Sequence, residues 1–344
     1  MKHKRVPFGC LPDGQMAELC TLSSEDVQVT ISTLGATIVG VRTPDKSGVW
    51  ADIALGFDTP AEYLEKPGCL GATIGRYAGR IANGTFPLNG KPVALMKNRG
   101  VHTIHGGPDG FSRRLWSVRT LEDDRLELEL FSPDGDQGFP GAVTVQADFT
   151  LNGNTLTLKT AASSDADTVC SLTNHVYWNL SGHDSGTVDG QLLSVPAKEY
   201  LETDEDTIPT GRKLSLKGTA LDLQAPTLLE AVEADHSFLL PSSGGMIQSA
   251  GRIQDPVSGR WLELSTDLPS VQVYTSDHLP EGIPGKNGAV YGPRSGVCLE
   301  SQFYPDSPNH VDFPSTVIHK GETVTHWICW RFGTKTDMEE THCE

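Results

Sequence analysis

The sequence predicts an all-β protein with few short helices, and three observations lead to this fold class. Apolar and polar residues alternate with a period of two along most of the chain, and this period belongs to strands. The 36 glycines and 22 prolines stand between short alternating segments, as turn residues do. Helical periodicity is sparse. Such a chain folds as an antiparallel sandwich or barrel.

The predicted strands follow one another in short runs with recognisable turns between them. Gly35-Ala36 separates the first two runs and predicts a hairpin, and Asn152-Gly153-Asn154 is a strong turn signal between two β-rich runs. In chain order, we expect strands at residues 27–34, 37–42, 125–131, 143–151, 155–161, 261–266, 271–276 and 323–332.

Two segments have helix signals. Residues 59–66 begin with a threonine cap followed by proline, and Glu62 stands at the third helical position, which predicts a helix of two turns at most. Residues 225–233 are a second short candidate. We find no repeat, low-complexity tract or linker that would divide the chain, and we therefore expect residues 1–344 to form a single domain.

The composition indicates a globular protein with an acidic surface. Asp and Glu number 44 against 27 Lys and Arg, and the resulting net charge of −17 repels phosphate backbones and anionic membranes. We therefore expect no nucleic-acid and no membrane partner. No apolar run is long enough for a transmembrane helix, and the basic N-terminus lacks the apolar segment of a signal peptide.

The seven cysteines are scattered and include no C-x-x-C pair. An odd, dispersed set argues against a disulfide framework and against a zinc knuckle. We therefore expect free thiols in a reducing cytoplasm.

The stretch TNHVYWNL has the most distinctive polar pattern. Read as one strand, it places His175, Tyr177 and Asn179 on one face. Val176 and Trp178 fall on the other face, where they can pack into a core. Histidine is the side chain most readily tuned for proton transfer near neutral pH. The pattern predicts a polar site on a rigid sheet; a buried histidine bonded to a backbone carbonyl is the alternative.

Two glycine-rich stretches hold further polar candidates. GATIGRYAGRIANG contains Arg76 and Arg80, but it lacks the lysine and the following helix of a phosphate-binding loop. We expect Arg80 to bind a hydroxyl or a carboxylate. In VHTIHGG, His102 and His105 could join His175 as metal ligands, but a strand would put the first two on opposite faces. We therefore expect no metal.

Two acidic residues stand beside or within apolar strands. Glu300 lies in VCLESQ, and a carboxylate in an apolar strand is costly unless it is paired or hydrogen-bonded. Glu300 is therefore a better functional candidate than the acids in charged runs. Asp235 precedes His236 and an apolar run, which is a weaker signal because aspartate is common in turns.

Taken in order, these stretches resemble the aldose 1-epimerase (galactose mutarotase) family. The matching strings are GRYAGRIANG, IHGG, DQGFPG, TNHVYWNLSG, IPTGR, DHSF, VQVYTS, GKNGAVYG and CLESQFYPDSPNH, which together extend over most of the chain. The resemblance implies a large antiparallel β-sandwich with an open sugar cleft and neither a metal nor an organic cofactor. It also implies interconversion of the α and β anomers of aldohexoses such as galactose and glucose.

The site residues of the family can be placed on this sequence motif by motif. The resemblance implies His175 as general acid and Glu300 as general base. Aromatic faces suit the apolar side of a pyranose, so Tyr177 or Trp178 is expected to reach the cleft. The residues that we expect to bind the sugar are Arg80, His105, Tyr177, Asp235 and Gln272.

One position departs from the family pattern. Gly79 stands where the family commonly has an asparagine before the arginine. A contact to one sugar hydroxyl is therefore either lost or supplied by Asn83 or by a water molecule, which leaves the sugar preference open.

Anomerisation requires two proton transfers and no redox chemistry. A base takes the proton of the C1 hydroxyl while an acid protonates the ring oxygen; the ring opens, the C1–C2 bond rotates and the ring closes on the other face. A carboxylate and an imidazolium on opposite sides of the ring suffice. His175 must then hold its proton at pH 7, which a nearby carboxylate favours.

Other functions stay open at this point. A hexose 6-phosphate mutarotase needs a basic cluster at the cleft, for which the chain offers Arg76, Arg80, Arg113 and Arg114. A non-catalytic carbohydrate-binding domain needs no opposed acid and base, and a glycosidase needs two carboxylates at a set separation. The expected partner is a small aldohexose, bound by a monomer, with a dimer as the alternative.

Overall fold

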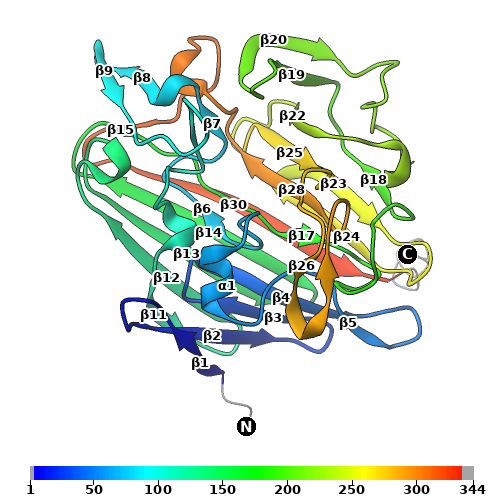
Figure 1. Cartoon of the computed structure of the whole chain (residues 1–344). Helices are drawn as coiled ribbons and strands as arrows, with labels where there is room; N and C mark the ends of the chain where they lie inside the picture. Colours follow the sequence, from blue (N-terminus) through cyan, green and yellow to red (C-terminus); the bar gives the residue numbers. More distant parts are fainter. Residues whose placement is uncertain (1–3, 335–344) are drawn as a thin grey trace.

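The computed structural model describes residues 4–334, which form antiparallel sheets with one short α-helix, α1 (Pro60–Glu65) (Figure 1). Three sheets make up most of the structure, and their neighbouring strands pair antiparallel throughout. The expected all-β sandwich with few helices is thereby confirmed. No helix among these residues is long and apolar enough to cross a membrane.

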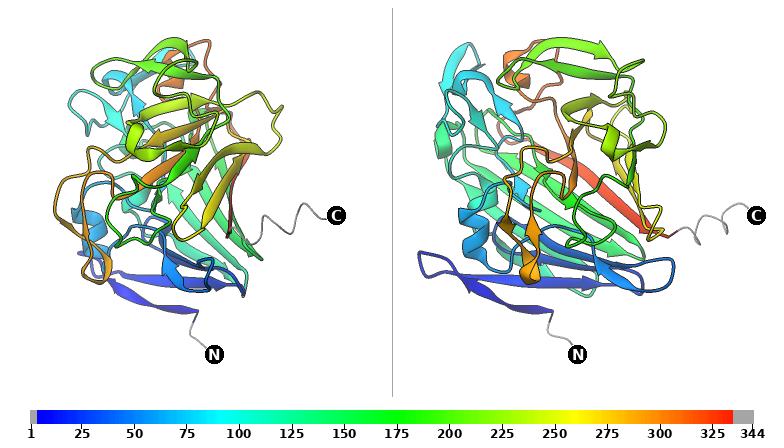
Figure 2. Two further views of the ribbon diagram at one scale, coloured as in Figure 1. Left: turned by 90° about the vertical axis from the view of Figure 1, so that its right-hand side faces the viewer. Right: turned by 45° about the vertical axis from the view of Figure 1, so that its right-hand side comes forward.

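The first sheet is N-terminal and has five strands in chain order. They are β1 (Arg5–Cys10), β2 (Met16–Ser23), β3 (Gln28–Ser32), β4 (Thr37–Pro44) and β5 (Trp50–Asp52). Figure 2 shows this sheet along the bottom of the molecule.

The second sheet has nine strands and includes the longest ones. In spatial order they are β11 (Ser117–Leu121), β12 (Arg125–Ser132), β13 (Val143–Asn152), β14 (Thr155–Ser164), β30 (Thr323–Gly333), β24 (Trp261–Thr266), β23 (Gln248–Gln254), β18 (Leu192–Ser194) and β21 (Thr227–Leu228). The last strand of the chain, β30, therefore lies in the middle of the sheet.

The third sheet has six strands and contributes most to the site described below. Its spatial order is β17 (Tyr177–Trp178), β28 (Val297–Gln302), β25 (Ser270–Tyr274), β22 (Asp235–Leu239), β19 (Glu199–Thr203) and β20 (Pro209–Ser215). Five two-stranded ribbons complete the β-structure: β6 (Thr73–Ile74) with β16 (Thr173–Asn174), β7 (Arg80–Ile81) with β10 (Thr103–Ile104), β8 (Thr85–Leu88) with β9 (Lys91–Ala94), β15 (Thr168–Val169) with β29 (Val317–Ile318), and β26 (Ile283–Pro284) with β27 (Val290–Tyr291).

One large hydrophobic core joins the three sheets. It takes apolar side chains from the N-terminal sheet, such as Val29, from the nine-stranded sheet, such as Phe149, and from the six-stranded sheet, such as Val273. Trp178 lies within this core, 6.2 Å from the ring of Trp330. The alternating burial that marks β13 and β14 is therefore the result of one face packing on this core.

All eight predicted strands are present, and both turn predictions are confirmed. Asn152 pairs with Thr155, so Gly153 and Asn154 form a two-residue turn between β13 and β14. Gly35 and Ala36 both have positive φ in the connection between β3 and β4. The helix signal at 59–66 is confirmed as well, with Thr59 and Glu62 forming a capping box at the start of α1.

The prediction of a helix at residues 225–233 is wrong. Thr227 and Leu228 extend the edge of the nine-stranded sheet by pairing with β18, and a single 3₁₀ turn, Leu229–Ala231, follows. The backbone N–H of Leu229 donates to the carbonyl of Gln191, and the Leu229 side chain is buried. Pairing and burial at the sheet edge therefore override the local helix propensity.

The six described cysteines are all unpaired thiols: Cys10, Cys20, Cys69, Cys170, Cys298 and Cys329. The seventh, Cys343, lies outside the described residues.

Candidate active site

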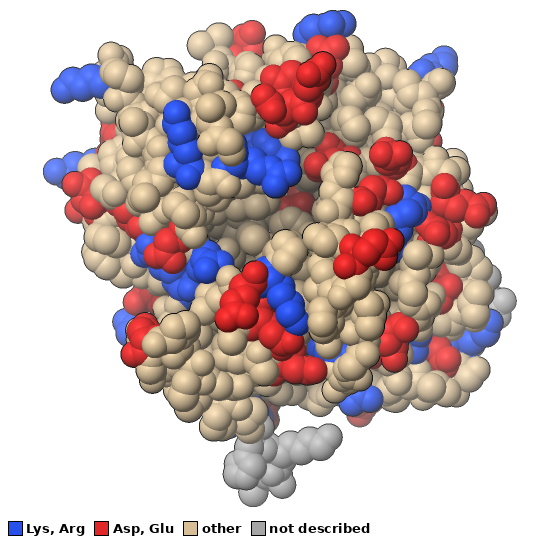
Figure 3. Space-filling view, viewed as in Figure 1, with Lys and Arg blue, Asp and Glu red and all other residues tan. Residues whose placement is uncertain are grey.

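A cleft over the six-stranded sheet contains both catalytic candidates and all five residues named from the family motifs as sugar-binding. These residues are Arg80, His105, His175, Tyr177, Asp235, Gln272 and Glu300. The cleft is visible as a hollow in Figure 3, with basic side chains beside its upper edge. Its cavity volume is about 250 Å³, close to the lower end of the range for small-molecule sites, which suits a small ligand.

Strand register places these side chains in two rows across the sheet. In one row, Ser237 on β22, Gln272 on β25 and Glu300 on β28 stand directly opposite one another. In the other, Asp235 stands opposite Tyr274. Residues opposite each other in antiparallel strands have Cβ atoms only about 5 Å apart. The pairing of strands distant in sequence therefore assembles the floor of the cleft.

His175 enters the cleft through a break in the predicted strand. The stretch TNHVYWNL is not one continuous strand, because Thr173–Asn174 pair with β6 whereas Tyr177–Trp178 pair with β28. At the break, the N–H of His175 donates to the carbonyl of Ala72, and the carbonyl of His175 accepts from the N–H of Gly71. The main chain around the imidazole is therefore fixed on both sides.

The predicted division of this stretch into two faces is correct except at Asn179. His175 and Tyr177 line the cleft with their rings stacked 5.0 Å apart, whereas Val176 and Trp178 are in the core. Of the two aromatic candidates in this stretch, Tyr177 is therefore the one that reaches the cleft. Asn179 does not line the cleft, because its buried amide donates to the carbonyls of Gly186 and Ser295 and so holds a neighbouring loop.

The imidazole of His175 and the carboxyl group of Glu300 are adjacent. Nε2 of His175 lies 3.6 Å from Oε1 of Glu300, and the two residues are 6% and 3% exposed. This separation leaves no room for a sugar ring between them, so the expectation of groups on opposite sides of the ring is wrong. Both groups instead face the same part of the cleft.

Burial shifts the pKa values of both groups toward their neutral forms. It lowers the pKa of His175 to about 4, although the negative charge of Asp235 acts in the opposite direction. Burial and the charge of Asp235 raise the pKa of Glu300 well above its usual value, against the lowering effect of Arg80. Burial therefore works against the charged form of His175 that we expected at pH 7, and it outweighs the effect of the neighbouring carboxylate.

The backbone around Arg80 and His105 positions both side chains in the cleft beside His175 and Glu300. Ile104 and Arg80 pair across the ribbon of β7 and β10. The N–H of Gly79 donates to Nδ1 of His105 at 3.3 Å, which leaves Nε2 of that ring as its protonated nitrogen when the imidazole is neutral. Burial, with the charges of His175 and Arg80, lowers the pKa of His105, so the neutral ring is favoured.

The polar groups expected to bind sugar hydroxyls differ in how many hydrogen bonds they already make within the protein. Nε2 of Gln272 donates to Oδ1 of Asp235 at 2.7 Å, and the hydroxyl of Ser237 donates to Oε1 of Gln272 at 2.5 Å. The Nε atom of Arg80 is buried and has no hydrogen-bond partner within residues 4–334. Arg80 is therefore a donor available to a ligand.

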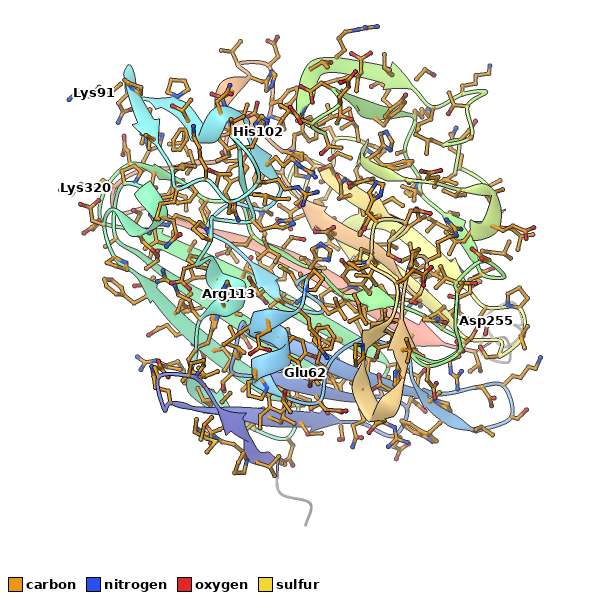
Figure 4. The ribbon with its side chains drawn as sticks, viewed as in Figure 1. Glu62, Lys91, His102, Arg113, Asp255 and Lys320 are labelled. Atoms are coloured by element: carbon orange, nitrogen blue, oxygen red, sulfur yellow. The ribbon has the colours of Figure 1, made fainter. Side chains whose placement is uncertain are left out.

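Several candidates from the sequence lie elsewhere. His102 contacts Asp206 and the N–H of Asn83. Figure 4 labels His102 in the upper part of the molecule. Neither His102 nor Asn83 lines the cleft, so Asn83 does not supply the contact missing at Gly79. In the part of the chain that the structure describes, no group of three or more His, Cys, Asp or Glu residues is arranged to hold a metal ion.

The basic cluster considered for a phosphate does not form. Arg76 is buried and donates to the carbonyls of Pro140 and Gly141. Arg113 donates to the carbonyl of Leu64, and Arg114 pairs with two aspartates. Only Arg80 of the four lines the cleft, where Arg99 joins it.

Sequence reasoning missed two kinds of cleft residue. Ser237, Tyr274 and Gln302 stand two positions from predicted site residues on the same strands, so the period of two could have revealed them. Arg99, Thr203, Thr207, Pro209 and His278 come from loops and strand ends, where no periodic signal exists.

Comparison with known proteins identifies the family of the chain. The family model described as aldose 1-epimerase matches residues 18–330. A galactose mutarotase from Bos taurus is 38% identical over 336 residues, which cover 95% of this chain and 98% of the relative. The chain belongs to the aldose 1-epimerase family.

Family membership places the protein among the isomerases. A bacterial relative and a solved structure agree with this membership. The aldose 1-epimerase of Escherichia coli K12 is 36% identical, with 88% of this chain and 91% of the relative covered. The structure of an aldose epimerase homologue from C. elegans superposes with a TM-score of 0.87 at 28% identity and covers 92% of this chain and 99% of that one. The sandwich is therefore the galactose mutarotase-like fold of the family.

Proposed function

We propose that this protein is an aldose 1-epimerase that interconverts the α and β anomers of aldohexoses such as D-galactose and D-glucose. The observation that carries the proposal is the adjacent imidazole and carboxyl group of His175 and Glu300 on the floor of a cleft lined with polar groups. The anomeric hydroxyl and the ring oxygen are bonded to the same carbon, so an acid and a base that lie side by side can reach both.

The proposed reaction moves two protons and breaks one bond. Glu300 takes the proton of the C1 hydroxyl while His175 protonates the ring oxygen, and the C1–O5 bond breaks to give the open-chain aldehyde. After rotation about C1–C2, the C5 hydroxyl attacks the other face of the aldehyde. His175 then takes back the proton of that hydroxyl and Glu300 returns one to the new C1 hydroxyl.

Burial opposes this assignment of roles, and the neighbouring charges support it only in part. The charge of Asp235 acts to raise the pKa of His175, which favours an acid, but it also raises the pKa of Glu300, and only Arg80 acts to lower that pKa and so favours a base. Sugar hydroxyls that fill the cleft would add hydrogen bonds to the charged forms. A neutral pair contains the same number of protons as a charged pair, but the roles are exchanged, with the protonated Glu300 as the donor and the neutral His175 as the acceptor.

Polarimetry tests the proposed function. Freshly dissolved α-D-galactose and α-D-glucose should reach their equilibrium rotation faster with the protein than in buffer alone. Unchanged traces for both sugars would contradict catalysis and favour a carbohydrate-binding domain. Glucose 6-phosphate serves as a comparison, and we expect it to be a poorer substrate because only Arg80 and Arg99 provide fixed positive charge in the cleft.

Treatment with EDTA is expected to leave the mutarotation rate unchanged. General acid and base catalysis by His175 and Glu300 needs no Lewis acid. The rate is measured before and after dialysis against the chelator. Loss of activity followed by recovery with zinc would contradict this prediction.

The expected partner is the sugar alone. The monomeric state, the cytoplasmic location and the single-domain organisation stay predictions from the sequence.

A further inference from the structure

Gln302 is a buried residue at the end of β28 whose amide the protein leaves unsatisfied. The residue is 1% exposed, and its Oε1 atom is buried without a hydrogen-bond partner within residues 4–334. Its main chain is well held, because the hydroxyl of Ser270 donates to the carbonyl of Gln302 at 2.8 Å. The strand is therefore fixed at this point while the side-chain amide has no assigned contact.

The amide lies in the cleft beside the catalytic pair. Gln302 follows Glu300 by two positions, so both side chains leave β28 on the same face, and both line the cleft. A Cβ atom added to Gly79 would lie 3.6 Å from Nε2 of Gln302. Gly79 therefore lies next to the Gln302 amide. The following residue, Arg80, also has a buried Nε atom without a hydrogen-bond partner among the described residues.

The comparison with Gln272 indicates what the Gln302 amide is for. Gln272 lines the same cleft, but Ser237 and Asp235 satisfy both ends of its amide. Buried polar side chains are nearly always hydrogen-bonded, and an unpaired one costs stability. An unpaired amide of this kind is tolerated where a ligand supplies the missing partner. A sugar hydroxyl can both donate and accept a hydrogen bond, as an amide can, and therefore matches the Gln302 side chain.

We infer that Gln302 is a further substrate-binding residue, whose amide hydrogen-bonds one hydroxyl of the pyranose and thereby contributes to sugar preference. This inference rests on the proposed function, because it takes an aldohexose as the ligand. Oε1 can accept a hydrogen bond from a hydroxyl but not from an ionised carboxylate, which has no donor, so the position favours neutral sugars.

The test combines a side-chain change with a change in the sugar. Calorimetry measures the Kd of galactose and of its 2-, 3-, 4- and 6-deoxy derivatives for the wild type and for Gln302→Met, which keeps the length of the side chain and removes the amide. We expect galactose to bind the variant about tenfold more weakly. For a single deoxy sugar, the two proteins should bind equally, because the hydroxyl that Gln302 contacts is already gone.

A matched control separates this role from a structural one. Gln191 is equally buried but lies outside the cleft, and its amide is satisfied by Leu180 and Asn179. Gln191→Met should lower the unfolding temperature and leave the pattern of sugar affinities unchanged. Gln302→Met, measured without sugar, should unfold at the wild-type temperature or above it, because it removes an unsatisfied group.

Equal weakening of all five sugars by Gln302→Met, or a loss of stability like that of Gln191→Met, would overturn the inference. Gln302→Asn provides a second variant if the first does not fold, and the same single deoxy sugar should be insensitive to it. Mutarotation by the wild type is followed in parallel. Sugar binding by the wild type without mutarotation would refute the proposed epimerase function but not the role of Gln302. Mutarotation by the wild type, together with an equal loss of affinity for all five sugars in Gln302→Met, would refute the role of Gln302 but not the epimerase function.

Discussion

His175→Asn is expected to lower the kcat of mutarotation by roughly 10²–10⁴-fold in a protein that stays folded. Asparagine can occupy part of the space of the imidazole and form hydrogen bonds, but it cannot donate and recover a proton in this pH range. The fold should persist, because Val176 and Trp178 anchor this segment in the core and the main chain of residue 175 is bonded on both sides. Polarimetry gives kcat, and circular dichroism checks the fold.

His102→Asn is the control for this variant. His102 is also a histidine near the cleft, but it contacts Asp206 and does not line the cavity. Its replacement should leave kcat within about twofold of the wild type, because a side-chain contact outside the cleft does not touch the sugar. Near-normal turnover by His175→Asn would remove the proton-transfer role from that residue.

Glu300→Gln is expected to lower kcat by a similar factor, roughly 10²–10⁴-fold. Glutamine keeps the volume and most of the hydrogen-bonding capacity of the carboxyl group but cannot accept the anomeric proton. We expect KM to change much less than kcat, since the groups that hold the sugar stay in place. Initial rates over a range of α-D-galactose concentrations separate the two constants.

The same variant should also change how stability depends on pH. Because burial raises the pKa of Glu300 in the folded protein, its contribution to stability is complete below its ordinary pKa and is lost as the pH rises through the raised value. The amide that replaces the carboxyl group in Glu300→Gln does not titrate. The unfolding temperature of the variant relative to the wild type should therefore increase as the pH rises above the ordinary pKa, and thermal unfolding at a series of pH values measures this.

Glu230→Gln is the matched control, since Glu230 is exposed on the turn after β21. It should leave kcat unchanged, because Glu230 does not line the cleft. A difference between Glu300→Gln and the wild type that is the same at every pH would show that the carboxyl group does not carry a raised pKa.

Local pattern was enough to predict most strands and to mark Glu300. Alternation located β12, β13 and β14, and the apolar surroundings of Glu300 marked that residue as unusual before any coordinates were considered. These features depend on neighbours in sequence, which is why local pattern shows them. The resemblance to the aldose 1-epimerase family then pointed to His105, Asp235 and Gln272, all of which line the cleft.

What the sequence could not provide depends on contacts between distant segments. The pairing of residues 227–228 with β18 turned a helix signal into a sheet edge, and two different partners divided the strand that contains His175. Desolvation opposes the expected charge of His175 by lowering its pKa, and burial is a property of the folded chain. The distance of 3.6 Å to Glu300 likewise follows from strand register.

β28 is buried at every one of its six positions, with Leu299 in the core and Glu300 on the floor of the cleft. A strand enclosed on both sides has almost no tolerance for inserted residues or altered volume, since each change disturbs packing and chemistry together. Variation among related enzymes should therefore concentrate in the flanking loops that contribute Arg99, Thr207 and His278. New sugar preferences would then arise mainly through these loops, around a floor in which Glu300 and Gln302 stay constant.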